Sequence, residues 1–525
     1  MYIVLFILLT LKTLIFMYNT EVVSHQIPVF LVSFLIILFV LSSIHLSNLK
    51  KKHWFAFSFY ALVSFIMFVD VVYYGYFNAL PSVSMLSQVD QITAVGDSIR
   101  ELLNIKRILF ILDLPLICFY ILKSRKEYKE HNIYLRVSLP SCILLVLVVM
   151  VSILNKKDLL VPVANQEFFT YHIMDIKYYT IGDDVENLDG LSEKDLEELK
   201  ERTKLKEGKY TGVGKGKNLI VIQVEALQNF VINHYYDGQE ITPNLNRLLK
   251  EKGIIYFNNY YQLLGRGNTS DAEFVSNNSL YPSMDEPTYI QFEENTFYGL
   301  PWILRDRGYT AWVFHGYEKE FWNRNRAYVN QGFQRFISEE DYEFTEEETI
   351  GFGIIDEVFY EQTLEYIKEL DNDNNNPFYA FIISLTSHTP FEMPEGYQYL
   401  NIRKEHEGTI LGNYLQAILY ADRALGDFLQ GLKEEGYYDN SVIAIYGDHF
   451  AISSLDKDKK EIMTHYLGYE YDLDEMMKVP LIIHIPGLDI SETIVRIGIQ
   501  LDFLPTILNI MGYENEKGLM FGRDL

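Results

Sequence analysis

A nearly unbroken apolar run ends in a carboxylate in the sequence NLIVIQVE, which occupies residues 218–225. Similar apolar runs recur along the chain, at 310–314, 378–385, 441–446 and 479–485. Amphipathic segments typical of helices lie between or after these runs, at 243–251, 300–307, 359–370, 412–435 and 501–511. Strands that are apolar throughout are buried on both faces, which indicates a parallel sheet covered by helices. The sequence therefore predicts an α/β domain with a mainly parallel central sheet over residues 218–525.

Polar residues follow four of the predicted strands: Glu225, His315, His388 and the pair Asp448-His449. Because ligands of parallel sheets bind beyond the carboxyl ends of the strands, we expect these side chains to converge at one edge. Asp448 and His449 combine a carboxylate oxygen with an imidazole nitrogen, a pair suited to zinc or manganese. The alternative is that Glu225 is an ordinary strand-end carboxylate and that His315 and His388 are structural histidines.

A glycine-rich loop leads into a predicted helix in the sequence GRGNTSDAEF, residues 265–274. The glycines allow a tight turn, and Asp271 and Glu273 complement the helix dipole. Thr269 has two interpretations. Either it is a plain helix cap, which the local sequence favours, or its hydroxyl is a nucleophile. A helix N-terminus receives an anionic phosphoryl group, and a bound divalent cation lowers the pKa of a hydroxyl.

An aromatic side chain and a guanidinium lie close together in the sequence FWNRNR, residues 321–326. Trp322 and Arg324 are the candidates of interest, because the planar guanidinium suits bidentate binding of phosphate. The alternative interpretation is a surface loop with one buried tryptophan.

The first part of the chain is far more apolar than the rest. Its apolar stretches cover 1–18, 27–46, 54–77, 105–122 and 135–154, and each is close to the ~20 residues that cross a bilayer. The first stretch is interrupted by Lys12 and is also compatible with a signal peptide, but further spans follow it instead of a soluble domain. Core helices are rarely so uniformly apolar. We expect a transmembrane region of five helices over residues 1–154.

Basic residues in the short loops predict how these helices are oriented. They cluster at 50–52 and 123–129, which places these two loops in the cytoplasm. Lys156 and Lys157 are basic residues on the predicted outer side, but the two clustered loops outweigh them. The N-terminus is therefore expected in the cytoplasm and, after five spans, residues 155–525 outside the cell membrane. Residues 155–217 contain a charged helical segment and a glycine- and lysine-rich stretch, and are expected to be a linker.

Charge and cysteine content argue against three features: nucleic-acid binding, a disulfide framework and a cysteine zinc site. The net charge of −26 argues against nucleic-acid binding, which needs lysine and arginine to neutralise phosphates. Cys118 and Cys142 both lie in apolar stretches. The polar part of the chain therefore has neither a disulfide framework nor a cysteine zinc site.

Together these features resemble the lipoteichoic acid synthase family, membrane-anchored phosphoglycerol transferases of the sulfatase/alkaline phosphatase superfamily. The resemblance covers nearly the whole chain. It rests on pieces that follow one another in the family's order: the strand ending at Glu225, the loop 265–274, FWNR at 321–324, SHTPF at 387–391, YGDH at 446–449 and QLDFLPT at 500–506.

The resemblance implies an α/β sulfatase-like extracytoplasmic domain behind five transmembrane helices. It also implies one bound Mn²⁺, with Mg²⁺ or Zn²⁺ as alternatives. The implied metal ligands are Glu225, Thr269, Asp448 and His449. Thr269 would also be the nucleophile, and His388 a general acid or base. The residues implied to surround the glycerol phosphate are His315, Trp322, Arg324 and His388.

The implied reaction takes glycerol phosphate from phosphatidylglycerol and adds it to polyglycerolphosphate or a glycolipid acceptor. Asn268 departs from the lysine of the family's synthases, which leaves open a primase or side-branch enzyme acting on another glycan or lipid. A phosphatase-like hydrolase is a further alternative, in which water replaces the alcohol. A non-catalytic scaffold is disfavoured because all the metal positions carry a suitable donor. A formylglycine sulfatase is disfavoured because neither cysteine lies in the outer domain.

Overall fold

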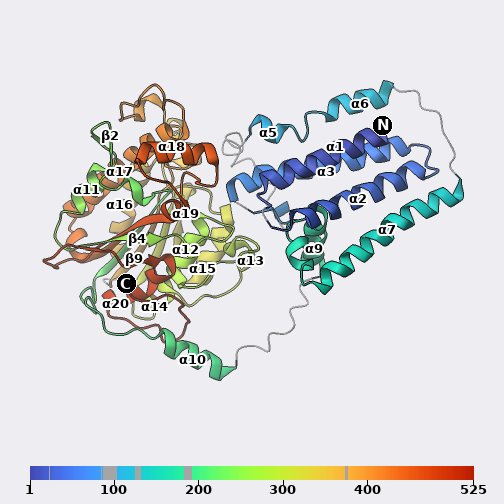
Figure 1. Cartoon of the computed structure of the whole chain (residues 1–525). Coiled ribbons are helices and arrows are strands. Elements are labelled where there is room, and N and C mark those ends of the chain that lie inside the picture. Colours follow the sequence, from blue (N-terminus) through green and yellow to red (C-terminus); the bar gives the residue numbers. More distant parts are fainter. Residues whose placement is uncertain are drawn as a thin grey trace. The chain divides into compact units, whose positions relative to one another are not determined.

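The computed structural model describes residues 1–22, 24–77, 79–83, 85–86, 103–123, 132–181, 192–372 and 376–525 (Figure 1). The chain divides into two compact units, Met1–Asn187 and Leu188–Leu525.

Long apolar helices make up most of the first unit. Those long and apolar enough to cross a membrane, among the described residues, are α1 (Tyr2–Asn19), α2 (Gln26–Leu46), α3 (Lys52–Phe77) and α7 (Ile133–Lys156). Helix α2 packs against α1, α3 and α7. These helices confirm four of the five predicted spans as continuous helices.

The fourth predicted stretch, 105–122, does not form one continuous helix. It forms the short helices α5 (Ile105–Ile108) and α6 (Leu114–Lys123), with a turn between them. Asp113 lies in that turn, and its Oδ1 accepts a hydrogen bond from Lys12 Nζ at 2.8 Å. Pro115, which has no N–H to donate, occupies the first turn of α6. The helix of this segment is therefore broken at Asp113, the carboxylate that pairs with Lys12 of the continuous helix α1.

Residues 155–217 are expected as a linker, and their described part contains the end of α7 and three further helices. Helices α8 (Leu160–Ala164) and α9 (Phe168–Ile181) belong to the first unit and pack against α2. The charged helix expected near 191–204 is α10 (Glu193–Thr203) in the second unit, where Ser192 caps its N-terminus. Neither α8 nor α9 is evident from the sequence, because α8 has only five residues and α9 mixes apolar with polar residues.

The second unit is built on one large sheet. Its strand order is β12-β4-β11-β10-β1-β9-β5-β6, with β13 pairing β4. The strand bounds are β1 Asn218–Val224, β4 Ile254–Tyr261, β5 Thr310–His315, β6 Arg335–Ile337, β9 Phe378–Ile383, β10 Ser441–Gly447, β11 Lys478–His484, β12 Glu492–Ile494 and β13 Gly498–Ile499. Strands β10, β1, β9, β5 and β6 run parallel, whereas β11 is antiparallel to both of its neighbours. The predicted mainly parallel sheet is confirmed.

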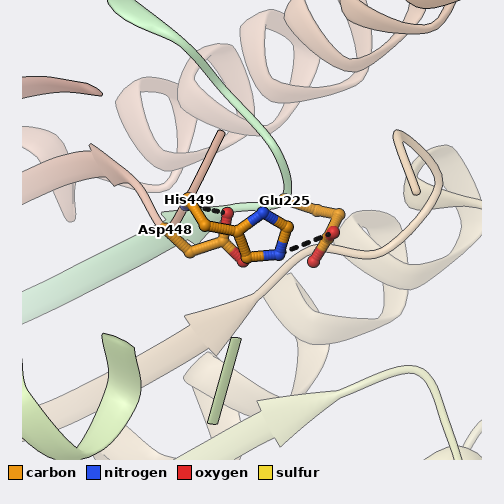
Figure 2. Close-up of side chains that lie close together, drawn as sticks. All are labelled: Glu225, Asp448 and His449. Carbon is orange, nitrogen blue, oxygen red and sulfur yellow. Dashed lines mark hydrogen bonds and ion pairs between the residues drawn. The ribbon is translucent and has the colours of Figure 1, made fainter. Parts of the chain in front are cut away.

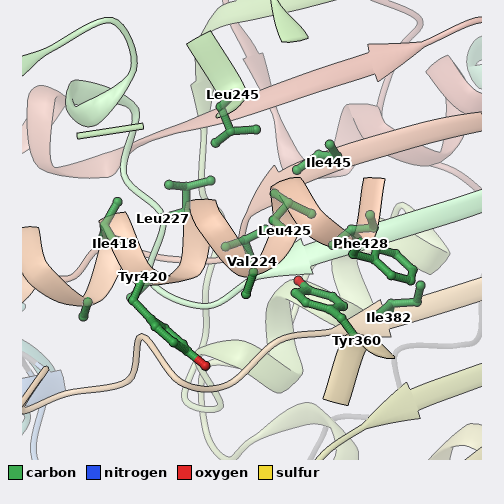
Figure 3. Packing of buried hydrophobic residues seen from close by; sticks show 14 of the residues in the cluster. Val224, Leu227, Leu245, Tyr360, Ile382, Ile418, Tyr420, Leu425, Phe428 and Ile445 are labelled. Carbon is green, nitrogen blue, oxygen red and sulfur yellow. The ribbon is translucent and has the colours of Figure 1, made fainter. Parts of the chain in front are cut away.

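Helices cover both faces of this sheet. Alternate residues of β1 enter different clusters: Ile220 and Ile222 pack with residues of α16 (Asp356–Asn372) and α17 (Ile410–Glu434). Leu219 and Val221 pack on the other face, with residues of α12 (Thr269–Asn278), α14 (Leu300–Arg305) and α20 (Phe503–Met511). Figure 3 shows the first of these clusters around the end of β1. Burial on both faces explains why the strands read as continuous apolar runs.

Asp422 links two helices on one side of the sheet. This buried carboxylate of α17 accepts hydrogen bonds from the backbone N–H groups of Asn244 at 2.8 Å and Leu245 at 2.9 Å. Both amides belong to the first turn of α11 (Pro243–Leu248), where backbone donors have no partner within the helix.

We predict that Asp422→Ala lowers the free energy of unfolding by about 1–3 kcal/mol, because it leaves one buried and one half-buried amide without an acceptor. Denaturant unfolding of the full chain measures the change. Gln430→Ala, an exposed position on the same helix, is the matched control and should leave the midpoint unchanged. Equal stability of the two variants would contradict this role.

Candidate active site

The site lies at the carboxyl ends of the central strands. Val224 at the end of β1 pairs with Gly447 at the end of β10, so Glu225 and Asp448 follow neighbouring positions. Gly447 is required there, because a Cβ on it would lie 1.9 Å from Leu227 O. His315 at the end of β5 pairs with Ile383 at the end of β9.

Three buried side chains form a compact anionic cluster (Figure 2). One ligand atom from each of Glu225, Asp448 and His449 lies within 4.8 Å of the others. His449 Nε2 is 3.4 Å from Glu225 Oε1 and 3.5 Å from Asp448 Oδ2. The other ring nitrogen, Nδ1, donates to Phe450 O at 2.9 Å. This hydrogen bond leaves Nε2 as the nitrogen directed at the carboxylates.

The cluster fits a divalent cation. Within the described part of the chain, Glu225 Oε1 and Asp448 Oδ2 are buried without a hydrogen-bond partner. Burial raises the pKa of Asp448, and the charge of Glu225 raises it further. Burial alone would lower the pKa of His449, but the two carboxylates outweigh it and raise the pKa to about 10. A buried carboxylate whose pKa is raised by a second carboxylate, next to carboxylate oxygens that lack donors, calls for positive charge.

The remaining oxygen of Asp448 is held by the backbone. Asp448 Oδ1 accepts hydrogen bonds from Ala226 N at 2.8 Å and from His449 N at 2.7 Å. Ala226 has a φ of 53°, an uncommon conformation for an alanine, which turns its N–H toward the site. This arrangement leaves Oδ2 for a ligand.

Thr269 lies beside this cluster and does not cap its helix. It is the first residue of α12, whose N-cap is Asn268, and no side chain caps that N-terminus. Its Oγ1 is instead 3.3 Å from Glu225 Oε2 and 3.3 Å from His449 Nε2. Asn268 adopts φ 43° and ψ −104°, strain of the kind found at functional turns. The geometry thus differs from the capping role that the local sequence favours.

Asp271 holds the loop in front of Thr269. The buried carboxylate accepts hydrogen bonds from Gly265 N at 3.1 Å and Gly267 N at 2.6 Å through Oδ2, and from Thr288 through Oδ1. The sequence predicts only an interaction with the helix dipole for this residue. No local pattern reveals such a function, because the hydrogen bonds form only when the loop before Asp271 and Thr288 after it fold back onto this carboxylate.

Arg324 is fully buried at the start of α15 (Arg324–Gln331) and forms an ion pair with Glu273, with Nη2 and Oε1 2.7 Å apart. Trp322, two residues earlier, has a φ of 59° and its ring packs edge-on against Phe321. The hypothesis of a plain surface loop does not describe a guanidinium buried in this way.

The two remaining histidines are both held in the neutral form. Burial lowers the pKa of His315 well below its usual value, and the charge of Arg324 lowers it further. Burial lowers the pKa of His388 to about 4. His388 Nδ1 donates to Thr389 O at 2.8 Å, and its ring lies 4.2 Å from that of Phe352. The adjacent Ser387 donates to Glu225 O at 2.7 Å, which ties the His388 loop to the anionic cluster.

Two parts of the chain match known families. Residues 217–513 match the sulfatase family, and residues 1–189 match the lipoteichoic acid synthase N-terminal domain.

Curated relatives and solved structures extend these matches over most of the chain. Lipoteichoic acid synthase 2 of Bacillus subtilis is 30% identical over 481 residues, covering 88% of this chain and 73% of the relative. Lipoteichoic acid synthase of Staphylococcus aureus is 30% identical over 493 residues, covering 91% and 75%. The structure of the lipoteichoic acid synthase LtaP from Listeria monocytogenes is 31% identical with a TM-score of 0.57, covering 62% of this chain and 80% of that one.

The phosphoethanolamine transferase EptA from Neisseria meningitidis shares the fold over 97% of this chain and 95% of its own, at 16% identity and a TM-score of 0.53. The apolar helices, the sheet and these matches together identify a membrane-bound phosphotransferase of the sulfatase superfamily, and the chain belongs to the lipoteichoic acid synthase family.

Proposed function

We propose that this chain transfers glycerol phosphate from phosphatidylglycerol to a polyglycerolphosphate chain or a related glycolipid acceptor, through a covalent intermediate on Thr269. The position of Thr269 Oγ1 carries the proposal, because it lies 3.3 Å from both Glu225 Oε2 and His449 Nε2. The lipoteichoic acid synthases among the relatives support this substrate class.

The proposed cofactor is one Mn²⁺ held by Glu225, Thr269, Asp448 and His449. Carboxylate, hydroxyl and imidazole donors suit Mn²⁺, and Mg²⁺ or Zn²⁺ are the alternatives. When bound, such an ion lowers the pKa of a hydroxyl ligand and neutralises charge on a phosphoryl group.

In the first step, Thr269 Oγ1 attacks the phosphorus of phosphatidylglycerol, and the bond from phosphorus to the diacylglycerol oxygen breaks. The proton of the Thr269 hydroxyl passes to the departing oxygen, so diacylglycerol leaves as a neutral alcohol. The backbone N–H groups at the start of α12 and the guanidinium of Arg324 stabilise the phosphoryl oxygens. His315 and Trp322 complete the proposed glycerol phosphate pocket.

In the second step, the acceptor hydroxyl attacks the same phosphorus, and the bond to Thr269 Oγ1 breaks. The acceptor's proton passes through His388 to the threonine oxygen, which restores the enzyme. His388 can take this role because its pKa of about 4 keeps it neutral, and its Nδ1 hydrogen bond leaves the lone pair on Nε2.

We predict that Thr269→Ala abolishes turnover of fluorescent phosphatidylglycerol with Mn²⁺, whereas Thr269→Ser retains part of it and forms a glycerophosphoryl adduct detectable by mass spectrometry. Since Thr269 is no cap, Thr269→Ala should cost less than the ~1 kcal/mol typical of a lost cap. Thr345→Ala, an exposed N-cap of the same domain, serves as the control and should stay active. Turnover by Thr269→Ala would refute the covalent mechanism.

We predict that Asp448→Asn loses its bound metal while staying folded, because the Oδ2 position then presents an amide in place of a carboxylate. Elemental analysis of the dialysed full chain measures the metal, and circular dichroism checks the fold. Asp439→Asn, an exposed aspartate before strand β10, should bind metal as the unmodified chain does. If the Asp448→Asn variant still binds a full equivalent of metal, Asp448 is not a metal ligand.

We also propose that the catalytic domain faces outward, on the basis of the basic loops at 50–52 and 123–129. Protease added to intact spheroplasts should then degrade residues 192–525, while a cytoplasmic marker protein stays protected. Degradation only after lysis would reverse the orientation.

A further inference from the structure

We infer that Glu273 is a positioning residue for phosphoryl transfer, which orients the guanidinium of Arg324 and fixes it to the helix that carries Thr269. The inference rests on the proposed function, in which Arg324 binds a phosphoryl oxygen. It assigns a role to a carboxylate that lies beyond the first turn of α12, where the helix dipole has little effect.

Glu273 receives the Arg324 side chain through two nitrogens. Arg324 Nη2 donates to Glu273 Oε1 at 2.7 Å, and Arg324 Nε donates to the same oxygen at 3.1 Å. The second carboxylate oxygen, Oε2, accepts a hydrogen bond from Tyr328 OH at 2.6 Å. Glu273 is 0% exposed and Arg324 is 1% exposed, so neither side chain has water as an alternative partner. The guanidinium is thus held through two of its three nitrogens.

One guanidinium nitrogen remains available. Arg324 Nη1 is buried and, within the described part of the chain, has no hydrogen-bond partner. A buried charged donor left in this way is costly and needs an explanation. An oxygen of a bound phosphoryl group explains it, because guanidinium donors match phosphate geometry.

The charge of Glu273 also stabilises the buried charge of this donor. Burial alone would lower the pKa of Arg324, but the neighbouring carboxylate raises it, so the guanidinium stays protonated. Its charge reaches the site, since it contributes to lowering the pKa of His315. Glu273 therefore stabilises the buried guanidinium of Arg324 while leaving one of its nitrogens, Nη1, without a partner.

Glu273 and Thr269 belong to one rigid element. Both lie on α12, four residues apart, and side chains at this spacing share a helix face. The distance from the nucleophilic oxygen to the guanidinium is thus set by one helical turn and one ion pair. A small error in that distance lowers the rate of a transfer reaction strongly.

A second ion pair on α15 offers a matched control. Arg326 Nη1 donates to Glu293 Oε1 at 2.8 Å, but the Arg326 side chain is 61% exposed. The same chemical pair therefore occurs on the same helix with an exposed guanidinium. Such exposed pairs contribute little.

The test is a double-mutant cycle in the full-length chain with Mn²⁺, using Glu273→Gln, Arg324→Gln and the variant with both changes. We expect Glu273→Gln to lower kcat/KM for phosphatidylglycerol by about 10- to 100-fold, as losing an orienting partner does. Arg324→Gln should lower it by about 100- to 1,000-fold. The double variant should match Arg324→Gln alone, because Glu273 acts through Arg324. Arg326→Gln should stay within about twofold of the unmodified chain.

Binding of glycerol phosphate, measured by calorimetry, is a second readout that needs no turnover. We expect Glu273→Gln and Arg324→Gln to weaken this binding, with the same non-additivity in the double variant. Unchanged binding and turnover in Glu273→Gln would overturn the inference. Losses that multiply in the double variant would also overturn it, because a merely structural role adds independently. If Glu273→Gln does not fold, comparing Arg324→Gln with the charge-balanced double variant decides between these outcomes.

Failure of the proposed function is distinguishable from failure of this inference. If the unmodified chain binds glycerol phosphate but does not turn over phosphatidylglycerol, the transfer reaction is refuted. The binding cycle then still reports whether Glu273 orients Arg324.

Discussion

The parallel register of β1 between β9 and β10 is the constraint on which the site depends. It places Val224 opposite Gly447, and this pairing brings the Glu225 carboxylate and the Asp448 carboxylate together in a buried place. Two adjacent buried carboxylates are unfavourable without compensating positive charge. The other groups of the site contact these carboxylates. Two backbone N–H groups donate to one Asp448 oxygen, and His449 and the Thr269 hydroxyl lie beside the remaining oxygens.

Helix α12 is the second element of the site, and it supplies more than its first residue. Its N-terminus carries Thr269, Asp271 secures the preceding glycine turn, and Glu273 holds Arg324. Three alternate residues of one helix, 269, 271 and 273, thus contribute to three different parts of the site. This concentration of roles explains why nearly every residue of the helix is buried, although its sequence is polar.

The sequence predicted what depends on local pattern. Apolar runs located the central strands, and the residue after each run located Glu225, His315 and Asp448 at the sheet edge. The local sequence around Thr269 instead favoured a cap, because Ser, Thr and Asp before a helix usually cap it. Its orientation depends on groups 44 and 180 residues away along the chain. No window of local sequence contains that information.

Ion pairs distant in sequence account for the other differences. The predicted fourth span is broken at Asp113, whose partner Lys12 lies 101 residues earlier. Glu273 and Arg324 are 51 residues apart. In both places a buried charge overrides the local preference, since leaving it unpaired costs more than ending a helix or burying a polar segment. The local sequence therefore does not predict the structure where a buried charge pairs with a residue distant in the chain. In the second unit, such buried charges lie around the proposed active site.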